Sequence, residues 1–414
     1  MILETPHRVE SGDEPTPEPT LDAGPRLAGR RSVLKGIGVA GVTLLVAGTG
    51  AISYRVYDNG VLDAGSGAPY EAWKQWRTDA SPLGAVAAAI LAANPHNTQP
   101  WVFHVTDTSV DVFSDPARRM PHMDALAREH HVGLGCALEN LVLAATARGY
   151  RTEVTLLPAA DDRSHVAHVA LSSAASTPSA LYDAIGDRHS NRGPYTSAPV
   201  SAATLADLAA QAQDLSGPTV RWFTSTAEKA ALGALIIDAT MAILGDEQQS
   251  REAFAWFRNN RDDIVKHRDG LTLDGQGLDE VTLTAAKLLP ASSRSAGDTF
   301  WLTQTRTVHT ATAAAYGVIT VADPADVSGR LTGGRLLQRI HLAATAQGLG
   351  MQHMNQITER IDHESAQGLP ATFSPRFDEL IAQPGRRALV TFRLGHPQRG
   401  ARLSPRRALN AVTR

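Results

Sequence analysis

The sequence predicts an α+β fold assembled from two related halves. Helical runs and short strands are interspersed along the chain without the regular strand–helix–strand order of a doubly wound sheet. One helical segment also recurs at a constant offset of 199 positions, because Leu143–Ala147 and Gly149 are matched identically by Leu342–Ala346 and Gly348. This long register favours a duplicated unit over the alternative of two unrelated alanine-rich helices.

Six short runs with alternating or β-branched residues predict the strands. Their bounds are Val102–Val105, Val110–Phe113, Val154–Leu157, Val166–Leu171, Val220–Phe223 and Ala388–Leu394.

Residues 1–57 carry a targeting pattern. Residues 1–28 are acidic and proline-rich, so we expect them to be disordered. Arg30-Arg31 then precede Leu34-Lys35 and an uncharged stretch, which matches the twin-arginine export signal. The alternatives are a short membrane anchor or a chance pair of arginines. We expect recognition by the twin-arginine export machinery and a location that is extracytoplasmic or membrane-tethered.

Composition narrows the class of protein. A hydrophobic content of 43% excludes a mainly disordered chain, and a net charge of −3 favours no nucleic-acid partner. The single cysteine, Cys136, excludes an intrachain disulfide and cysteine-rich metal sites, and no metal is expected. Only five of the 39 basic residues are lysines, so 34 are arginines. A GC-rich genome explains most of this excess, and anion binding is the functional alternative.

Residues 70–180 form the first predicted half. An apolar helix leads into Asn94-Pro-His-Asn97-Thr-Gln99-Pro-Trp101 and then a strand. Amide side chains both donate and accept hydrogen bonds, so Asn94, Asn97 and Gln99 could bind the edge of a planar heterocycle. The spacing alone favours the simpler interpretation, a turn that stops the helix. The repeated helix follows and ends at Gly149.

Residues 181–414 form the second predicted half. Arg188-His-Ser190-Asn-Arg192 places two arginines near one face of a helical turn, which is either a phosphate clamp or a solvated surface. Residues 245–310, with dense charge and a glycine-rich stretch, are interpreted as an insertion that serves as a lid. Residues 385–414 hold eight arginines and no acidic residue. This tail either frays or returns one or two arginines to a bound phosphate.

The ordered set of motifs resembles the FMN-dependent nitroreductases over roughly residues 70–410. The Asn97–Trp101 run and the closing Ser404–Leu409 segment are most similar to the single-chain, Acg-type branch of that family. The resemblance implies a nitroreductase-like α+β fold with two fused halves that form an intrachain pseudo-dimer, acting as a monomer. Since the amide loop lies only in the first half and the arginine motif only in the second, one flavin site is expected.

The resemblance also implies a role for each motif. Arg188, Ser190 and Arg192 would hold the FMN phosphate and ribityl end, assisted by Arg406 or Arg407. Asn94 and Asn97 would contact the flavin, with Gln99 in support, while Asn355 and Gln356 would lie at its reactive edge. Three positions depart from the family pattern: Asn94 where serine is common, the unusual Pro95, and Asn355 where relatives place an acidic residue.

The implied function is an FMN-dependent oxidoreductase that passes electrons from NAD(P)H to a small nitro- or quinone-type acceptor. The flavin carries this chemistry, so no catalytic side chain is required. One alternative is a flavin-binding or sequestering protein with little turnover, which the lid and the scarcity of NAD(P)H outside the membrane favour. A degenerate paralogue kept for partner binding is another.

Overall fold

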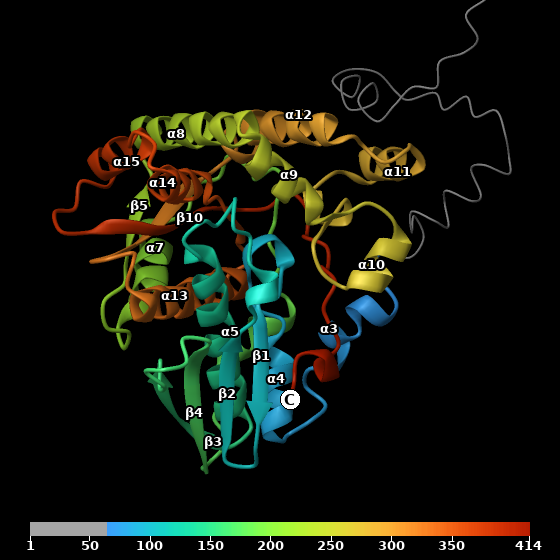
Figure 1. Ribbon diagram of the computed structural model, residues 1–414, viewed down its shortest axis with the longest axis vertical. Helices are drawn as coiled ribbons and strands as arrows, with labels where there is room; N and C mark the ends of the chain where they lie inside the picture. Colours follow the sequence, from blue (N-terminus) through green and yellow to red (C-terminus); the bar gives the residue numbers. More distant parts are fainter. Residues whose placement is uncertain (1–63) are drawn as a thin grey trace, which may run out of the picture.

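The computed structural model describes residues 64–414, so the expected disordered segment and the twin-arginine pattern at Arg30 and Arg31 lie outside the described residues. Among residues 64–414, no helix combines the length and apolar character needed to cross a membrane. The described chain is an α+β fold in which two four-stranded antiparallel sheets are separated by paired helices (Figure 1).

The first sheet has the strand order β1-β2-β4-β3, with every neighbouring pair antiparallel. Its strands are β1 (Trp101–Val105), β2 (Ser109–Ser114), β3 (Tyr150–Leu156) and β4 (His165–Ser173). All four predicted strands of this region form. The third begins earlier than predicted and stops before Leu157, whose φ of 50° turns the backbone out of the strand.

The second sheet has the order β5-β8-β10-β9 and is likewise antiparallel throughout. Its strands are β5 (Thr219–Phe223), β8 (Ala315–Val321), β9 (Gly350–His353) and β10 (Arg387–Gly395). The two sheets therefore share one topology, in which the first two strands are neighbours and the fourth strand lies between the second and the third. The sequence patterns predicted β5 and β10 but did not predict β8 or β9.

Each sheet has a twenty-residue helix that connects its second strand to its third strand. α5 (Arg128–Ala147) links β2 to β3, and α13 (Val327–Ala346) links β8 to β9, at the repeat offset of 199. They pack against each other in the middle of the molecule (Figure 1). Residues from both helices and both sheets form one continuous hydrophobic cluster, so the sheets share a core.

Further helices surround this centre. They are α3 (Ala72–Gln75), α4 (Pro82–Ala89), α6 (Ala180–Asp183), α7 (Ala202–Ala209), α8 (Thr226–Gly245), α14 (Gln356–Gln367) and α15 (Phe373–Ile381). All of them except the twenty-residue α8 are shorter than α5 and α13. α4 packs on α5, whereas α8, α14 and α15 cover a second hydrophobic cluster against β8 and β10.

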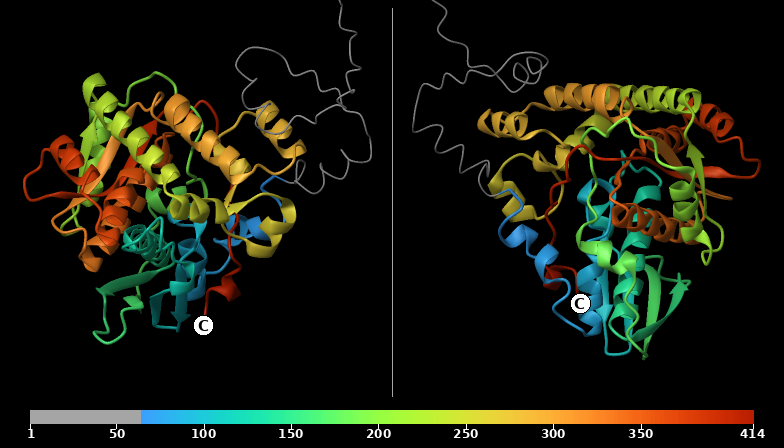
Figure 2. Two further views of the ribbon diagram at one scale, coloured as in Figure 1. Left: turned by 45° about the horizontal axis from the view of Figure 1, so that its top comes forward. Right: turned by 180° about the vertical axis from the view of Figure 1, so that it is seen from behind.

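The segment between α8 and β8 adds no strand to either four-stranded sheet. It contains α9 (Glu247–Ala255), β6 (Phe257–Arg258), α10 (Arg261–His267), β7 (Leu271–Thr272), α11 (Glu280–Leu288) and α12 (Arg294–Gln304). β6 and β7 pair in parallel as a two-stranded ribbon. Figures 1 and 2 show this segment extending from the end of α8 along one side of the molecule, with α10 and α11 at its outer edge.

The C-terminal segment does not fray. After β10 it runs back along α3 to the first sheet (Figure 1), where the Phe103 amide donates to Val412 O at 2.7 Å and the Arg414 amide donates to Phe103 O at 2.9 Å. On the way, the Trp73 indole donates to Ser404 O at 2.7 Å. The last residues of the second half are thereby fastened to the first half, which places Arg406 and Arg407 against the loop at residues 94–99.

Candidate functional site

Two adjoining cavities lie where the first half, the second half and the 245–310 segment meet. The larger has a volume of about 240 Å³ and the smaller about 50 Å³. Both are lined by Asn94, Ser190, Arg192 and Leu271, so they are neighbouring compartments of one site.

The smaller cavity is lined by buried arginines that lack acidic partners. Arg188 is 2% exposed and Arg406 is 3% exposed, and both line it together with Arg192. Within residues 64–414 no carboxylate lies within 4.0 Å of any of the three guanidinium groups. Their hydrogen bonds go mainly to backbone carbonyls: Arg188 Nη2 donates to Leu91 O at 2.8 Å, and Arg192 Nη1 donates to Gly275 O at 3.1 Å. The Nε atoms of Arg188 and Arg406 have no hydrogen-bond partner in the part of the chain that the structure describes.

Burial makes this positive cluster unfavourable on its own. It lowers the pKa of Arg188 and of Arg192 to about 10, and it lowers the pKa of Arg406 well below the ordinary range, an effect to which the charge of Arg188 adds. An anion in the cavity would offset the desolvation of these guanidinium groups and supply their missing acceptors. The compartment therefore has the charge and the free donors that a phosphate group requires.

The predicted helical turn at Arg188–Arg192 is wrong. The segment is extended, because Ser190 forms an isolated parallel bridge with Met351 of β9 and the Asn191 amide donates to Met351 O at 2.9 Å. Pairing with the edge of the second sheet has overridden the local helical spacing. The extended form still directs Arg188, Ser190 and Arg192 to the same cavity.

The amide loop has a constrained backbone. His96, Asn97 and Gln99 have φ values of 45°, 56° and 53°, a region that non-glycine residues seldom adopt. Asn94 stabilises the turn, because its Oδ1 accepts from the Gln99 amide at 2.7 Å and its Nδ2 donates to Ala92 O at 3.1 Å. Three such residues together indicate that tertiary contacts impose this shape on the loop.

Asn97 connects three segments. Its Nδ2 donates to Gly270 O at 3.2 Å and to Pro405 O at 2.9 Å, and its Oδ1 accepts from Arg406 Nη1 at 2.8 Å. Asn97 lines the smaller cavity, yet its side-chain hydrogen bonds are already made within the protein. The structure therefore gives it a positioning role that sets the orientation of Arg406, and direct contact with a ligand stays a prediction.

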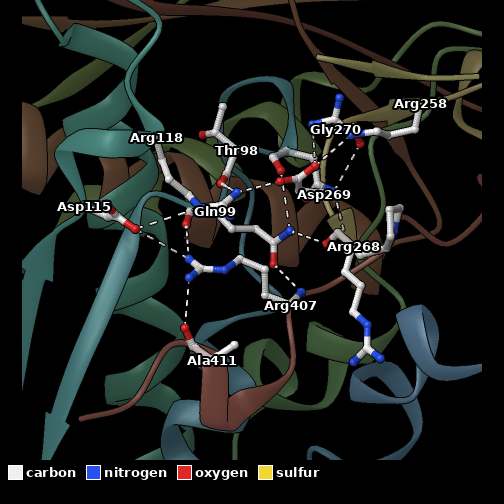
Figure 3. Close-up of polar contacts among 12 residues, drawn as sticks. Thr98, Gln99, Asp115, Arg118, Arg258, Arg268, Asp269, Gly270, Arg407 and Ala411 are labelled. Carbon is white, nitrogen blue, oxygen red and sulfur yellow. Dashed lines mark hydrogen bonds and ion pairs between the residues drawn. The ribbon is translucent and has the colours of Figure 1, made fainter. Parts of the chain in front are cut away.

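Gln99 and Arg407 line neither cavity and lie in a network behind the loop (Figure 3). Gln99 Nε2 donates to Arg268 O at 2.8 Å, and Gln99 Oε1 accepts from the Arg407 amide at 2.8 Å. The Arg407 guanidinium donates to Gln99 O and Ala411 O. Of the two tail arginines that the sequence offered, the structure places Arg406 in the cavity wall and Arg407 outside it.

Asp269 fastens the 245–310 segment to the first half (Figure 3). Its buried carboxylate accepts from Arg118 Nη1 at 2.6 Å, and from Arg258 Nε at 2.8 Å and Nη2 at 2.6 Å. Arg118 follows β2 whereas Arg258 belongs to β6. The Gly270 amide also donates to Asn97 O at 3.2 Å. These bonds hold one edge of the cavity closed.

Most residues that the 245–310 segment contributes to the larger cavity are apolar, and they include Phe254, Phe257, Leu273, Leu278, Phe300 and Trp301. The same segment also contributes the polar residues Asn259, Gln276, Ser292, Asp298 and His309. The cavity is also lined by four polar residues from the end of β9 and the start of α14, namely Gln352, His353, Asn355 and Gln356. A cavity lined by both apolar and polar side chains suits a flat ligand that has polar groups along one edge.

Several polar atoms of the larger cavity have no partner in the described chain. They are Glu129 Oε1, His309 Nδ1, His353 Nε2 and Gln356 Oε1. Asn355 differs from Gln356, because its Oδ1 accepts from the Thr391 amide at 3.0 Å. Buried polar atoms are normally satisfied, so these four mark positions where a ligand or water would be expected to bind.

The histidines at the site are neutral at pH 7. Burial, followed by the charge of Arg192, lowers the pKa of His96 to about 4. Burial, followed by the charges of Arg188 and Arg192, lowers the pKa of His353 to about 3. A neutral imidazole both donates and accepts hydrogen bonds, so these side chains add polar contacts without adding charge.

Sequence reasoning missed two acidic residues of the larger cavity. Glu129, on α5, and Glu359, on α14, line its wall and are 8% and 7% exposed. No motif links residues 230 positions apart, so only their convergence in space identifies them. Cys136 also lines this cavity, and burial raises the pKa of its thiol to about 12.

Comparison with known proteins gives partial matches. No protein-family model matches the chain. The chain is 30% identical over 170 residues to the Mycobacterium tuberculosis (strain H37Rv) protein named "Putative NAD(P)H nitroreductase Rv3131", covering 41% of this chain and 48% of that protein. It is 33% identical over 90 residues to "Putative NAD(P)H nitroreductase acg" from the same organism, covering 22% and 27%. The chain thus spans half or less of the length of these curated relatives.

Among solved structures, the chain is similar to a nitroreductase with bound FMN from Desulfitobacterium hafniense (TM-score 0.33, 14% identity, 56% of this chain and 95% of that one). It is also similar to an NADPH:FMN oxidoreductase from Vibrio harveyi complexed with NAD+ (TM-score 0.32, 13% identity, 57% and 76%). Because these TM-scores are low, the fold described above rests on the strands and helices of this chain alone.

Proposed function

We propose that this protein is an FMN-dependent oxidoreductase of the nitroreductase family that passes electrons from NAD(P)H to a nitro- or quinone-type acceptor. The observation that carries the proposal is a group of three arginines, the buried Arg188 and Arg406 and the half-buried Arg192. They have no carboxylate partner within residues 64–414 and adjoin a larger cavity with many apolar side chains. The similarity to proteins named NAD(P)H nitroreductases supports it.

The residues present fit FMN. Its phosphate requires several charged donors, which the smaller cavity supplies through Arg188, Arg192 and Arg406, with the Ser190 hydroxyl at the junction. Its ring system requires an apolar compartment with polar groups along one edge, which the larger cavity supplies through Asn94, His353 and Gln356. The sequence motifs and the cavities thus point to the same ligand.

When bound, FMN supplies reversible two-electron chemistry between a nicotinamide donor and an acceptor. The chain's own residues bind and orient it. Arg188 and Arg406 fix the anionic end, the constrained 94–99 loop holds one wall in place, and the aromatic residues of the 245–310 segment exclude water from the larger cavity.

The proposal includes an intrachain pseudo-dimer that retains one flavin site. Its support is the shared strand order of the two sheets and the placement of α5 and α13 at the same offset of 199. The site takes the 94–99 loop from the first half, and the Arg188–Arg192 segment and β9 from the second. We therefore propose that the protein acts as a monomer, with both parts of the site in one chain.

The experiment is a comparison of FMN with riboflavin, which lacks only the phosphate. Purified full-length protein is titrated with each, and binding is followed by quenching of flavin fluorescence. We expect FMN to bind more tightly by about 10²-fold, because charge-assisted hydrogen bonds contribute about 1.5–3 kcal/mol each. Equal affinities would contradict the phosphate site, and failure to bind either ligand would contradict the flavin assignment.

A second candidate is flavin binding or sequestration with little turnover. The observation that favours it is the anchoring of the 245–310 segment across the site by Asp269 and Asn97. Addition of NADPH to the FMN-loaded protein separates the two functions. Rapid bleaching of the flavin absorbance followed by reoxidation with a quinone supports the oxidoreductase, whereas resistance to reduction supports sequestration.

A further inference from the structure

Two carboxyl groups from different halves of the chain meet at the wall of the larger cavity. Glu129 lies in the first turn of α5, and Glu359 lies in the first turn of α14. Both side chains are more than nine-tenths buried, and they lie within hydrogen-bonding reach of each other when one carries a proton. Two carboxylates cannot share this position without a proton between them, because each would repel the other in a poorly solvated site.

The neighbouring acidic residues are stabilised as anions in ways that this pair is not. Asp124 accepts from the backbone amides of Glu129 at 3.1 Å and His130 at 2.8 Å, and these bonds partly offset the burial that raises its pKa to about 6. Asp362 forms a buried ion pair with Arg128. Glu129 and Glu359 have no ion pair with a lysine, an arginine or a histidine of residues 64–414. Besides Glu359, the Asn355 side chain is a hydrogen-bond partner of Glu129.

The charges around the pair also favour its protonated form. Asp124 and Asp362 add negative potential, and the nearby cations are oriented elsewhere: Arg128 donates to Asp362 and Ala388 O, and Arg330 Nη1 donates to Leu126 O. Arg192, Asp298, His309 and His353 also line the cavity, and the two histidines are neutral. Burial, then the charge of Asp124, raises the pKa of Glu129 to about 8, and burial, then the charge of Glu129, raises the pKa of Glu359 well above its ordinary value.

We propose that Glu129 and Glu359 form a proton-storing pair that delivers a proton to the acceptor bound in the larger cavity. The proposal rests on the proposed function. Reduction of a quinone to a hydroquinone consumes two electrons and two protons, and a reduced nicotinamide supplies two electrons with one hydrogen nucleus. The second proton leaves a carboxyl O–H bond of the pair and forms an O–H bond at the acceptor oxygen. Water then restores the lost proton.

The pair suits this task because the negative charge left by the released proton is shared between two carboxyl groups. With both carboxyls protonated, release of one proton leaves the other shared between two oxygens, so the new negative charge is spread over both groups. Glu129 lines the cavity wall, and its Oε1 is a buried atom with no hydrogen-bond partner in the described chain, so it is free to bond to an acceptor that a side-chain rotation brings within reach. A proton donor whose pKa lies near the working pH is also the most effective kind.

The first test needs no cofactor. Infrared spectra of the apo protein are compared for the parent, the double variant Glu129→Gln/Glu359→Gln and the control Glu379→Gln, whose carboxyl is on the surface of α15. We expect the parent at pH 7 to show the carbonyl stretch of protonated carboxyl groups, the control to retain it, and the double variant to lose most of it. Absence of the band from the parent, or equal intensity in the double variant, would overturn the proposal.

The second test separates proton delivery from electron transfer. FMN-loaded parent and double variant, with matched flavin affinity, are reduced with dithionite and mixed with either 1,4-naphthoquinone or ferricyanide. Ferricyanide accepts electrons without a proton. We expect the variant to reduce naphthoquinone about 10²-fold more slowly and ferricyanide at the parental rate.

Equal rates with naphthoquinone, or equal slowing with both acceptors, would overturn the proton-storing role. Because dithionite reduces the flavin directly, this result does not depend on whether NAD(P)H is the electron donor. If the parent binds no FMN, the proposed function fails, whereas the infrared test still decides whether the pair stores a proton.

Discussion

Gly135 of α5 and Gly334 of α13 face each other where the two central helices cross, and they are separated by the repeat offset of 199 residues. The contacts are reciprocal: a Cβ on Gly135 would overlap the carbonyl of Leu331, and a Cβ on Gly334 would overlap the carbonyl of Val132, which is itself 199 positions before Leu331. Gly135 contacts Leu331 in the same way that Gly334 contacts Val132, and the two contacts exchange equivalent residues of the two helices. This reciprocity is typical of a two-fold symmetric interface.

Gly135→Ala should destabilise the protein by about 2–4 kcal/mol, because an added methyl group would meet backbone that cannot rotate away. Gly334→Ala should have a similar effect. Urea unfolding measures both, and Gly245→Ala serves as the control, since a Cβ there has no neighbour within 4 Å. If either central variant unfolds with the same midpoint as Gly245→Ala, the helices do not approach as closely as described.

Arg188→Met should separate ligand binding from stability. FMN affinity should fall by about 1.5–3 kcal/mol, whereas riboflavin affinity should not change. The apo protein should keep or gain about 1 kcal/mol of stability, because a buried unpaired charge is removed and Leu91 O retains its bond from Arg406 Nη2 at 3.1 Å.

The matched control for Arg188→Met is Arg407→Met, since Arg407 lies outside both cavities. It should leave the ratio of FMN to riboflavin affinity at the parental value. If the ratio of FMN affinity to riboflavin affinity falls further in Arg407→Met than in Arg188→Met, the phosphate lies nearer Arg407.

Asp269→Asn should loosen the 245–310 segment. Loss of the carboxylate charge leaves Arg118 and Arg258 without their buried ion pair, a change that typically costs about 3–5 kcal/mol. Amide hydrogen exchange across residues 255–275 should accelerate, and stopped-flow measurements should show FMN leaving at least about tenfold faster. Asp161→Asn, at an exposed position, should change neither quantity. Unaltered exchange in Asp269→Asn would show that other contacts hold the segment closed.

The stability of the apo protein should depend on pH through Glu129. Its pKa rises from 4.5 to about 8 on folding, so the folded chain retains a proton that the unfolded chain releases. The stabilisation from this proton is complete below pH 4.5 and is lost as the pH rises through 8. Between pH 5 and 8 the free energy of unfolding of the parent should therefore fall relative to that of Glu129→Gln, by a few kcal/mol. The free energy of unfolding of both proteins is measured by urea unfolding at each pH. If it changes with pH by the same amount in the parent and in Glu129→Gln, the raised pKa of Glu129 is contradicted.

The proposed export signal is tested by replacing Arg30 and Arg31 with lysine in a fusion to an export reporter. The twin-arginine pattern requires both guanidinium groups, so the double variant should remain in the cytoplasm while the parent is exported. Export of the variant at the parental level would favour the alternative of a simple membrane anchor.

Local patterns predicted the elements whose residues alternate or repeat. β2 and β4 bury every second residue over much of their length, so a period of two was visible before folding. β8 was not predicted because all seven of its residues are buried, and a strand covered on both faces has no alternation to detect. The extended Arg188–Arg192 segment was mistaken for a helical turn because its partner, β9, lies 160 residues further along the chain.

By itself, the sequence determined the α+β class, most strands, the two equivalent helices and the motifs that supply the loop and the arginines. These depend on residue types within a few positions of one another, where backbone geometry limits the possibilities. Tertiary structure alone decided that Arg406 rather than Arg407 faces the cavity, that Asn97 positions Arg406, and that Glu129 meets Glu359. Each of those outcomes depends on burial and on contacts between residues more than 200 positions apart, which the closing of the shared core brings together.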